Sequence, residues 1–583
     1  MWRFRTTRVQ VIWSRAYSSD AKIPATSLAT QNVENRPAPA IGMTLGAVPT
    51  AIPRNPTATP TKPLVVKETV AKTAKPDIKA NPKVCSFGDI PGPISLQLIS
   101  KFWSHVPVIS STFTAGALFQ VMNLGKFFGN ILSWGGNAKF FQKFFNVYGP
   151  VVRLHGPFGG DVVLLSRPEH ASLVFRHEGD QPVRSCLDSV EKYRLEHRKM
   201  RQAGPFVMSG MEWERLHKTL EKPMAADEAV AHHFANIAHI CDEFVDRVGA
   251  VRNLQDEVPG DFMAEVLKWA LECMCSVTLN RKFGFLDPTG LSPTSDPGRL
   301  IEAVGAATDA IRRCEYGFHV WKFMETPAWK SLVKNCDTID AILGKYVEHA
   351  QSYLKDTKFK TSNYTVIESL LARDDVLVED VMTVLLDMFL IGANALAHSA
   401  AFLLYHLAKN PRCQRKLMQE IEKLPQQEPL TANAVRSMKY LRACARESLR
   451  LKPPIPILNR VLSEDAVIHK YFIPKGTYVL IATHLASLRD EYFEDALKFN
   501  PERWFSPEVS PIGDEIQRFA SLPFGYGPRG CVAKELAEIE IGLLVIKTVK
   551  RFKVAYNYGD VESSNVLLAS PAKPLKFTLE DRV

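Results

Sequence analysis

A short stretch near the end of the chain combines the residue types that could hold a metal in a flat ligand. Residues 524–533 read Phe-Gly-Tyr-Gly-Pro-Arg-Gly-Cys-Val-Ala, and a helical pattern follows from about Ala533 to Arg551. The amide groups and the dipole at a helix N-terminus favour the thiolate of Cys531, which is the form that binds metal. The glycines let the backbone approach a ligand closely. Phe524 can cover the sulfur, and Arg529 can reach a negatively charged edge.

The pattern Phe-x-x-Gly-x-Arg-x-Cys resembles the haem-binding loop of the cytochromes P450. The resemblance implies that haem b is the cofactor, that Cys531 is the axial ligand of its iron, and that Arg529 pairs with a haem propionate. Thiolate ligation favours cleavage of the O–O bond. One position departs from the family, because Ala533 stands where glycine is usual.

Residues 378–409 form an apolar helical pattern that ends at Asn410-Pro411. Its polar residues predict a helix through the centre of a large domain and argue against a membrane span. The family pattern Ala-Gly-x-(Asp/Glu)-Thr-Thr reads here Ile-Gly-Ala-Asn-Ala-Leu from Ile391 onward. Gly392 keeps the gap in which oxygen sits, but Asn394 replaces the acid and Ala395 replaces the threonine. Neither can act as a proton acid, and for His398, one turn further on, a core position is the better interpretation.

Three consequences of this change stay open. A substrate hydroxyl or a chain of waters carries the protons, or the enzyme releases peroxide, or the reaction needs no oxygen activation.

Other motifs extend the resemblance along the chain. Glu447 and Arg450 lie three residues apart on one helical face, as in the family's Glu-x-x-Arg motif, and Pro-Glu-Arg-Trp supplies Arg503 as the third member of a structural cluster. Trp213 and His217 occupy the place of a Trp-x-x-x-Arg pair that reaches the propionates. Histidine in that place puts the second contact in doubt, and Arg460 would provide another.

Basic residues near the two motifs predict a docking surface. Arg442 and Arg446 match positions at which mitochondrial cytochromes P450 bind ferredoxin, and Lys534 keeps one of two further positive charges, whereas Glu535 reverses the other. Phe-Arg-His-Glu-Gly at 175–179, followed by Pro182 and Arg184, is similar to a signature of the same branch.

The charge of the chain is concentrated at its beginning. Residues 1–85 hold 13 Lys/Arg and 4 Asp/Glu, a net of +9 out of the +10 of the whole 583-residue chain, so nothing favours a nucleic-acid surface. Residues 1–17 are rich in arginine and contain no acid, which is typical of a mitochondrial transit peptide. Residues 18–85 are rich in Pro, Ala, Thr and Lys and are predicted to be a disordered linker. The ten cysteines show no metal or disulfide spacing.

The resemblance implies a mainly α fold with a small β-rich region, a single large haem domain over residues 86–583. We expect a monooxygenase that inserts one oxygen atom from O2 into a small apolar, steroid-like substrate. Its electrons would come from NADPH through a ferredoxin reductase and a [2Fe–2S] ferredoxin, at the matrix side of the mitochondrial inner membrane. The apolar stretch 113–134 would lie on that membrane or in the core. Asn394 and Ala395 keep alternatives open: an isomerase or dehydratase that needs no external electrons, or a haem protein of low turnover.

Overall fold

The computed structural model describes residues 84–94, 96–97, 138–155, 161–184, 186–287, 289–316, 319–356, 365–425, 429–505, 514–564 and 568–582. All of them belong to one compact unit, Asp77–Val583. The leader 1–17, nearly all of the linker 18–85 and the apolar stretch 113–134 lie outside the described residues. What we expect of these segments stays a prediction.

Helices make up most of the described chain, as expected for the fold class. The α-helices are α3 Ala138–Tyr148, α4 Pro168–Arg176, α5 Asp188–Lys192, α6 Met211–Ala225, α7 Asp227–Val251, α8 Phe262–Leu279, α9 Asp296–Tyr316, α10 Pro327–Asp356, α11 Val366–Leu371, α12 Val378–Asp387, α13 Ala393–Lys409, α14 Pro411–Ile421, α15 Ala432–Ser437, α16 Lys439–Leu451, α17 Thr483–Ser487, α18 Asp514–Phe519 and α19 Lys534–Arg551. Short 3-10 or π turns are η1 Phe87–Asp89, η4 Tyr193–His197, η5 His319–Lys322, η6 Met388–Gly392, η7 Pro501–Trp504 and η8 Gly527–Arg529.

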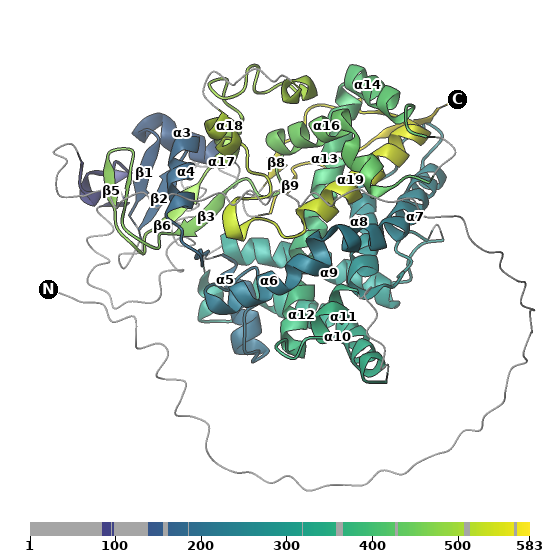
Figure 1. Ribbon diagram of the computed structural model, residues 1–583, viewed down its shortest axis with the longest axis horizontal. Coiled ribbons are helices and arrows are strands. Elements are labelled where there is room, and N and C mark those ends of the chain that lie inside the picture. Colours follow the sequence, from purple (N-terminus) through teal and green to yellow (C-terminus); the bar gives the residue numbers. More distant parts are fainter. Residues whose placement is uncertain are drawn as a thin grey trace, which may run out of the picture. The chain divides into compact units, whose positions relative to one another are not determined.

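The β-rich region is small and lies to one side of the helices in Figure 1. Its main sheet has the strand order β1-β2-β6-β3, with β1 Val151–Leu154, β2 Val162–Leu165, β6 Tyr478–Ile481 and β3 Leu458–Val461. Only β2 and β6 in this sheet run parallel. Three two-stranded sheets complete the described strands: β4 Ala466–Ile468 with β5 Tyr471–Ile473, β7 Phe552–Ala555 with β10 Thr578–Asp581, and β8 Ser563–Ser564 with β9 Ser570–Pro571.

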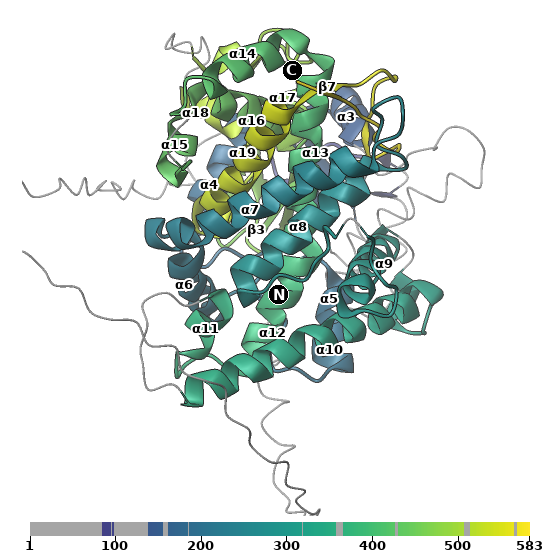
Figure 2. The same cartoon turned by 90° about the vertical axis from the view of Figure 1, so that its right-hand side faces the viewer.

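One long helical segment with a π turn inside it organises the α-rich part. Helices α12 and α13, joined by the π turn η6, form a continuous segment Val378–Lys409 that packs against α8, α16 and α19. Figure 2 shows α13, α19, α7 and α8 packed next to one another. The segment is long and apolar enough to cross a membrane, but 83% of its most apolar window is buried inside the protein. The predicted core helix is therefore confirmed, while the π turn was not foreseen.

Two buried histidines on α13 make the fold sensitive to acid. His398 is fully buried and its Nε2 lies 3.2 Å from the carbonyl oxygen of Lys452, while Nδ1 of His406 lies 2.9 Å from Ser448 Oγ. Burial lowers the pKa of each imidazole from 6.5 to about 3. Both rings are therefore neutral in the folded protein at pH 7.

We expect stability to fall as the pH drops below 6.5, because the unfolded chain then binds protons that the folded chain excludes. Each of the two histidines contributes to the slope of the unfolding free energy, and its contribution approaches roughly 1.4 kcal/mol per pH unit as the pH falls well below 6.5. Urea unfolding at a series of pH values between 7 and 5 measures this slope. His406→Gln should reduce it by one such contribution, and an unchanged slope would contradict this view of the buried rings.

Candidate active site

The Cys531 loop is a tight hairpin that leads into α19. The backbone N–H of Cys531 donates to the carbonyl of Phe524 at 2.8 Å. Gly527 has a φ of +68°, and a Cβ atom there would lie 2.4 Å from Oε1 of Glu178. Only glycine fits this position, because both the left-handed backbone and the close carboxylate exclude a side chain. These contacts fix the position of the cysteine relative to α19.

The loop also contacts the β-rich region. Glu178 accepts a hydrogen bond from Arg460 Nε at 2.5 Å, and Arg460 Nη2 donates to the carbonyl of Tyr526 at 3.4 Å. The Arg460 guanidinium lies 5.0 Å from the ring centre of Phe175. Glu178 lies just after α4, and Arg460 lies on β3. The ion pair between these two residues thus holds the hairpin against the sheet.

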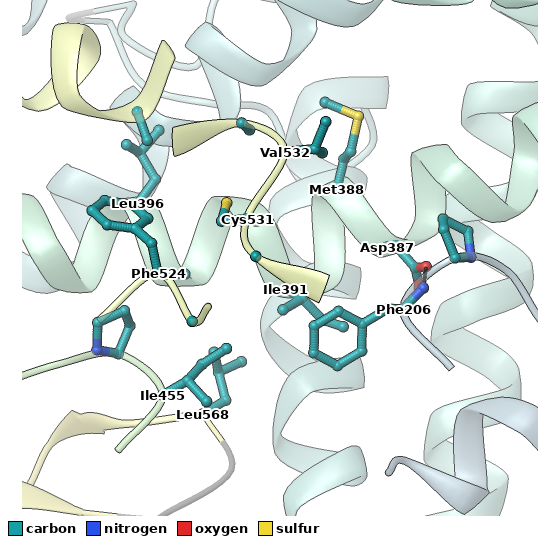
Figure 3. A pocket seen from close by; sticks show the side chains of 18 of the residues that line it. Phe206, Asp387, Met388, Ile391, Leu396, Ile455, Phe524, Cys531, Val532 and Leu568 are labelled. Atoms are coloured by element: carbon teal, nitrogen blue, oxygen red, sulfur yellow. Dashed lines mark hydrogen bonds between the residues drawn. The ribbon is translucent and has the colours of Figure 1, made fainter. Parts of the chain in front are cut away.

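A cavity of about 340 Å³ lies between this loop and the central helical segment Val378–Lys409. Phe524, Cys531 and Val532 line it from the loop, and Ile391 and Leu396 line it from the helix (Figure 3). Most of its other lining residues are apolar as well, among them Leu220, Met224, Met274, Val277, Ile311, Ile455 and Leu568. The sulfur of the loop therefore faces a largely apolar space.

The pKa of the Cys531 thiol differs from our expectation. Burial raises this pKa, although the amide of Ala533 and the charges of Arg184 and Lys534 act in the opposite direction. The cysteine has exposed surface, and it lines both this cavity and a second, neighbouring pocket. The helix N-terminus alone thus does not produce a thiolate, and a cation bound at the sulfur would supply the missing stabilisation.

Gly392 and Ala395 line the cavity, whereas Asn394 does not. The Asn394 amide points toward α9, where its Nδ2 donates to Thr308 Oγ1 at 3.1 Å. The same nitrogen also donates to the carbonyl of Leu390, one turn earlier in its own helical segment, at 2.9 Å. The residue in the place of the acid therefore joins two helices. His398 is a core residue, packed with its ring centre 4.6 Å from that of Phe402.

Buried guanidinium groups gather at one end of the cavity. Arg529 is 6% exposed and donates to the carbonyls of Pro182 and Met208 and to Ser209 Oγ. Burial and the neighbouring Arg184 lower its pKa to about 9, and burial likewise lowers the pKa of Arg460. Nη1 of Arg529 and Nε of Arg184 are buried and have no hydrogen-bond partner. This end of the cavity is therefore suited to a ligand with negative charges.

Trp213 and His217 on α6 lie beside these arginines. Their rings stack 5.0 Å apart, and the Arg529 guanidinium lies 4.2 Å from the ring centre of Trp213. Burial lowers the pKa of His217, although Glu221 raises it in part. His217 is thus a neutral hydrogen-bonding group near pH 7 and does not replace the charge of the family's arginine.

The structure brings Glu447, Arg450 and Arg503 together as one buried cluster. Arg450 donates twice to Glu447, at 2.9 and 2.7 Å, and Arg503 Nε donates at 3.0 Å. Trp504 Nε1 and the backbone amide of Asn500 complete the carboxylate's partners at 3.1 Å each. Every oxygen of this fully buried acid is satisfied, and the cluster joins α16 to the segment that includes η7.

A second pocket, of about 920 Å³, lies on the other side of the Cys531 loop. Arg442, Arg446 and Lys534 all line it, together with Arg436, Lys439, Arg518, Glu535 and Glu538. The Arg446 guanidinium lies 3.9 Å from the ring centre of Trp504, which itself donates to Glu447. Arg446 therefore also contacts the Glu447 cluster. The three predicted docking residues therefore share one mainly basic surface.

Comparison with known proteins agrees with this geometry. The profile of the family "Cytochrome P450" matches residues 120–579. The chain belongs to the cytochrome P450 family. Similar proteins include "Probable cytochrome P450 49a1" of Drosophila melanogaster, 29% identical over 89% of this chain and 87% of the relative, and "Cytochrome P450 302a1, mitochondrial" of the same fly, 26% identical over 83% and 96%. "Cytochrome P450 12b1, mitochondrial" of Drosophila acanthoptera is 30% identical over 70% and 78%.

As a cytochrome P450, the protein is a haem b monooxygenase, and its cavity fits that group. The cavity has a cysteine on one wall and buried, incompletely bonded arginines at one end, which suit the iron and the two propionates. Sequence reasoning missed the cavity position of Arg184 and the contact of Thr308 with Asn394. Arg184 stands in the mitochondrial-type signature that we noted, but no local pattern indicates that α9 brings Thr308 to α13.

We expect Glu447→Gln to lower the free energy of unfolding strongly, because the substitution leaves the fully buried Arg450 without its counter-charge. Breaking such a pair costs about 3–5 kcal/mol, and urea unfolding with haem content measures the loss. Glu580→Gln is the matched control, since Glu580 pairs with Lys553 at the surface and should change stability by less than about 1 kcal/mol. Equal stability of the two variants would contradict the structural role of Glu447.

Proposed function

We propose that Cys531 is the axial ligand of the haem iron. Three features support this assignment: the sulfur faces the cavity, the hairpin fixes its position, and Phe524 lines the same wall. When bound, the haem supplies the redox chemistry that activates O2. The raised pKa of the free thiol fits a site in which the metal and the cysteine stabilise each other's charge.

We further propose that the propionates lie among Arg184, Arg460 and Arg529, with Trp213 and His217 beside them. Two carboxylates there would bond the unused Nη1 of Arg529 and Nε of Arg184. They would also compensate guanidinium charges whose burial otherwise lowers their pKa. This pairing would fix the orientation of the ring in the cavity.

The chain's own residues also set the substrate class. Phe206, Ile391, Leu396 and Leu568 line the cavity near the cysteine, so an apolar substrate would displace water from apolar walls. Gly392 leaves space on the helix side, because it has no side chain. These walls favour a small apolar molecule, and we propose that the substrate is steroid-like.

The electron donor in this proposal is a [2Fe–2S] ferredoxin, reduced by NADPH through a ferredoxin reductase. Arg442, Arg446 and Lys534 form a basic surface behind the Cys531 loop, which an acidic partner would recognise. Several relatives are named mitochondrial, which supports a mitochondrial location. We infer a transit peptide at residues 1–17, a linker at 18–85, a haem domain at 86–583, and a place at the matrix side of the inner membrane.

A second candidate function rests on one observation. Neither Asn394 nor Ala395 can pass on a proton, and the Asn394 amide is bonded to Thr308 and Leu390. An isomerase or dehydratase, or a haem protein of low turnover, would need no protons at this place and no external electrons.

Reconstitution separates these functions. We expect the haem-loaded chain, with ferredoxin and its reductase, to consume O2 only when NADPH is present, and to convert an apolar compound that perturbs its absorbance spectrum. Conversion of that compound without NADPH would favour the isomerase, and neither conversion nor O2 consumption would favour the haem protein of low turnover.

Charge reversal tests the docking surface. Arg442→Glu and Lys534→Glu should each weaken ferredoxin binding by roughly 1 kcal/mol, which is about fivefold in the apparent KM for ferredoxin, and the difference should shrink at high salt. Lys553→Glu, on β7 outside this pocket, serves as the control. A KM that responds equally to all three changes would contradict the proposed surface.

A further inference from the structure

The cavity contains two hydroxyl groups among its described lining residues, and both lie next to the altered oxygen-side motif. Thr308 reaches the cavity from α9, and Ser399 reaches it from α13. Because Ala395 lacks the family's hydroxyl, either group is a candidate for the missing proton donor. Their hydrogen bonds distinguish them.

The Thr308 hydroxyl is already committed. It donates to the carbonyl of Val304 at 2.8 Å and accepts from Asn394 Nδ2 at 3.1 Å, and the residue is 2% exposed. Rotating the Thr308 side chain toward the cavity would remove its oxygen from Asn394 Nδ2 and so break this contact between α9 and α13. Its geometry indicates a role in holding the two helices together.

Ser399 has more freedom. It lies one turn after Ala395, so Ile391, Ala395 and Ser399 form one stripe along the cavity wall. Its Oγ donates to the carbonyl of Ala395 at 2.8 Å. That carbonyl is also the helical partner of the Ser399 amide, so it stays bonded when the hydroxyl turns away. Rotation of one side-chain bond therefore frees the proton at little cost.

The acids that line the cavity are less suitable. Asp387 accepts from Arg194 Nη2 and from the backbone amide of Phe206, both at 2.8 Å, so its two oxygens are occupied. Glu540 also lines the cavity, but it lies on α19, the helix that follows the Cys531 loop, and not on the helical segment that carries Gly392 and Ala395. No charged group of α13 lines the cavity among the described residues.

We propose that Ser399 delivers protons to the oxygen side of the haem, in place of the missing threonine; this rests on the proposed haem-thiolate function. The Ser399 hydroxyl gives a proton to the reduced oxygen and takes one back from a cavity water. With protons delivered and no substrate present, O2 takes up four electrons and four protons to form two H2O. Without delivery, O2 takes up two electrons and two protons and leaves as H2O2. NADPH supplies the electrons through ferredoxin.

The test needs no substrate. The haem-loaded full chain is supplied with NADPH, reductase and ferredoxin, and the H2O2 formed per O2 consumed is measured. Ser399→Ala should slow the water-forming branch roughly 10²-fold, so that nearly all O2 appears as peroxide. Ser399→Thr should retain the wild-type ratio, because it keeps the hydroxyl. Ala395→Thr in the Ser399→Ala background should restore water formation.

Two further measurements separate a proton donor from a structural residue. The C–O stretching frequency of the carbon monoxide complex should rise in Ser399→Ala, because a hydrogen-bond donor near the ligand is lost, while the thermal midpoint stays unchanged. Thr308→Val, the matched hydroxyl deletion, should lower the midpoint without changing the peroxide ratio.

A wild-type ratio in Ser399→Ala, or a peroxide increase in Thr308→Val alone, would overturn the role of Ser399. A wild-type chain that consumes no O2 with NADPH would instead refute the proposed function.

Discussion

The buried positive charge at one end of the cavity is the constraint on which the rest of the structure depends. Arg184, Arg460 and Arg529 converge there, and Glu178 bonds one of them directly. Buried guanidinium groups are costly unless they are paired. In the site that we propose, the two haem propionates would compensate this charge, and Cys531 on the neighbouring wall would hold the iron. Charge compensation would thus link the fold of the domain to the presence of its cofactor.

The two sides of the cavity are built by different means. On the cysteine side, hydrogen bonds within a hairpin and one tight glycine set the position of the sulfur. On the helix side, the π turn η6 interrupts the central helix, and the Asn394–Thr308 contact joins this helix to α9. The residue in the place of the acid therefore makes a contact between helices. In our proposal, proton delivery belongs to Ser399 instead.

Local motifs explain what the sequence could predict. The cysteine loop, the Glu447–Arg450 pair and the central helix are encoded by residues at short spacings or by a long apolar period. Arg503 lies 56 positions from Glu447, and only its own motif, Pro-Glu-Arg-Trp, indicated that it joins this pair. The bonds of Asn394 to Thr308 and of Asp387 to Arg194 join residues 86 and 193 positions apart, which no local pattern reveals. The expected low pKa of Cys531 failed for a related reason, since desolvation depends on the packing of the whole domain.

The carbon monoxide difference spectrum of the reduced protein tests the central claim most directly. We expect the long-wavelength Soret band of a thiolate-ligated haem for the wild-type chain and for Cys85→Ser, and its loss in Cys531→Ser. A Soret band that is unchanged in Cys531→Ser, or a purified wild-type protein that binds no haem, would contradict iron ligation by Cys531.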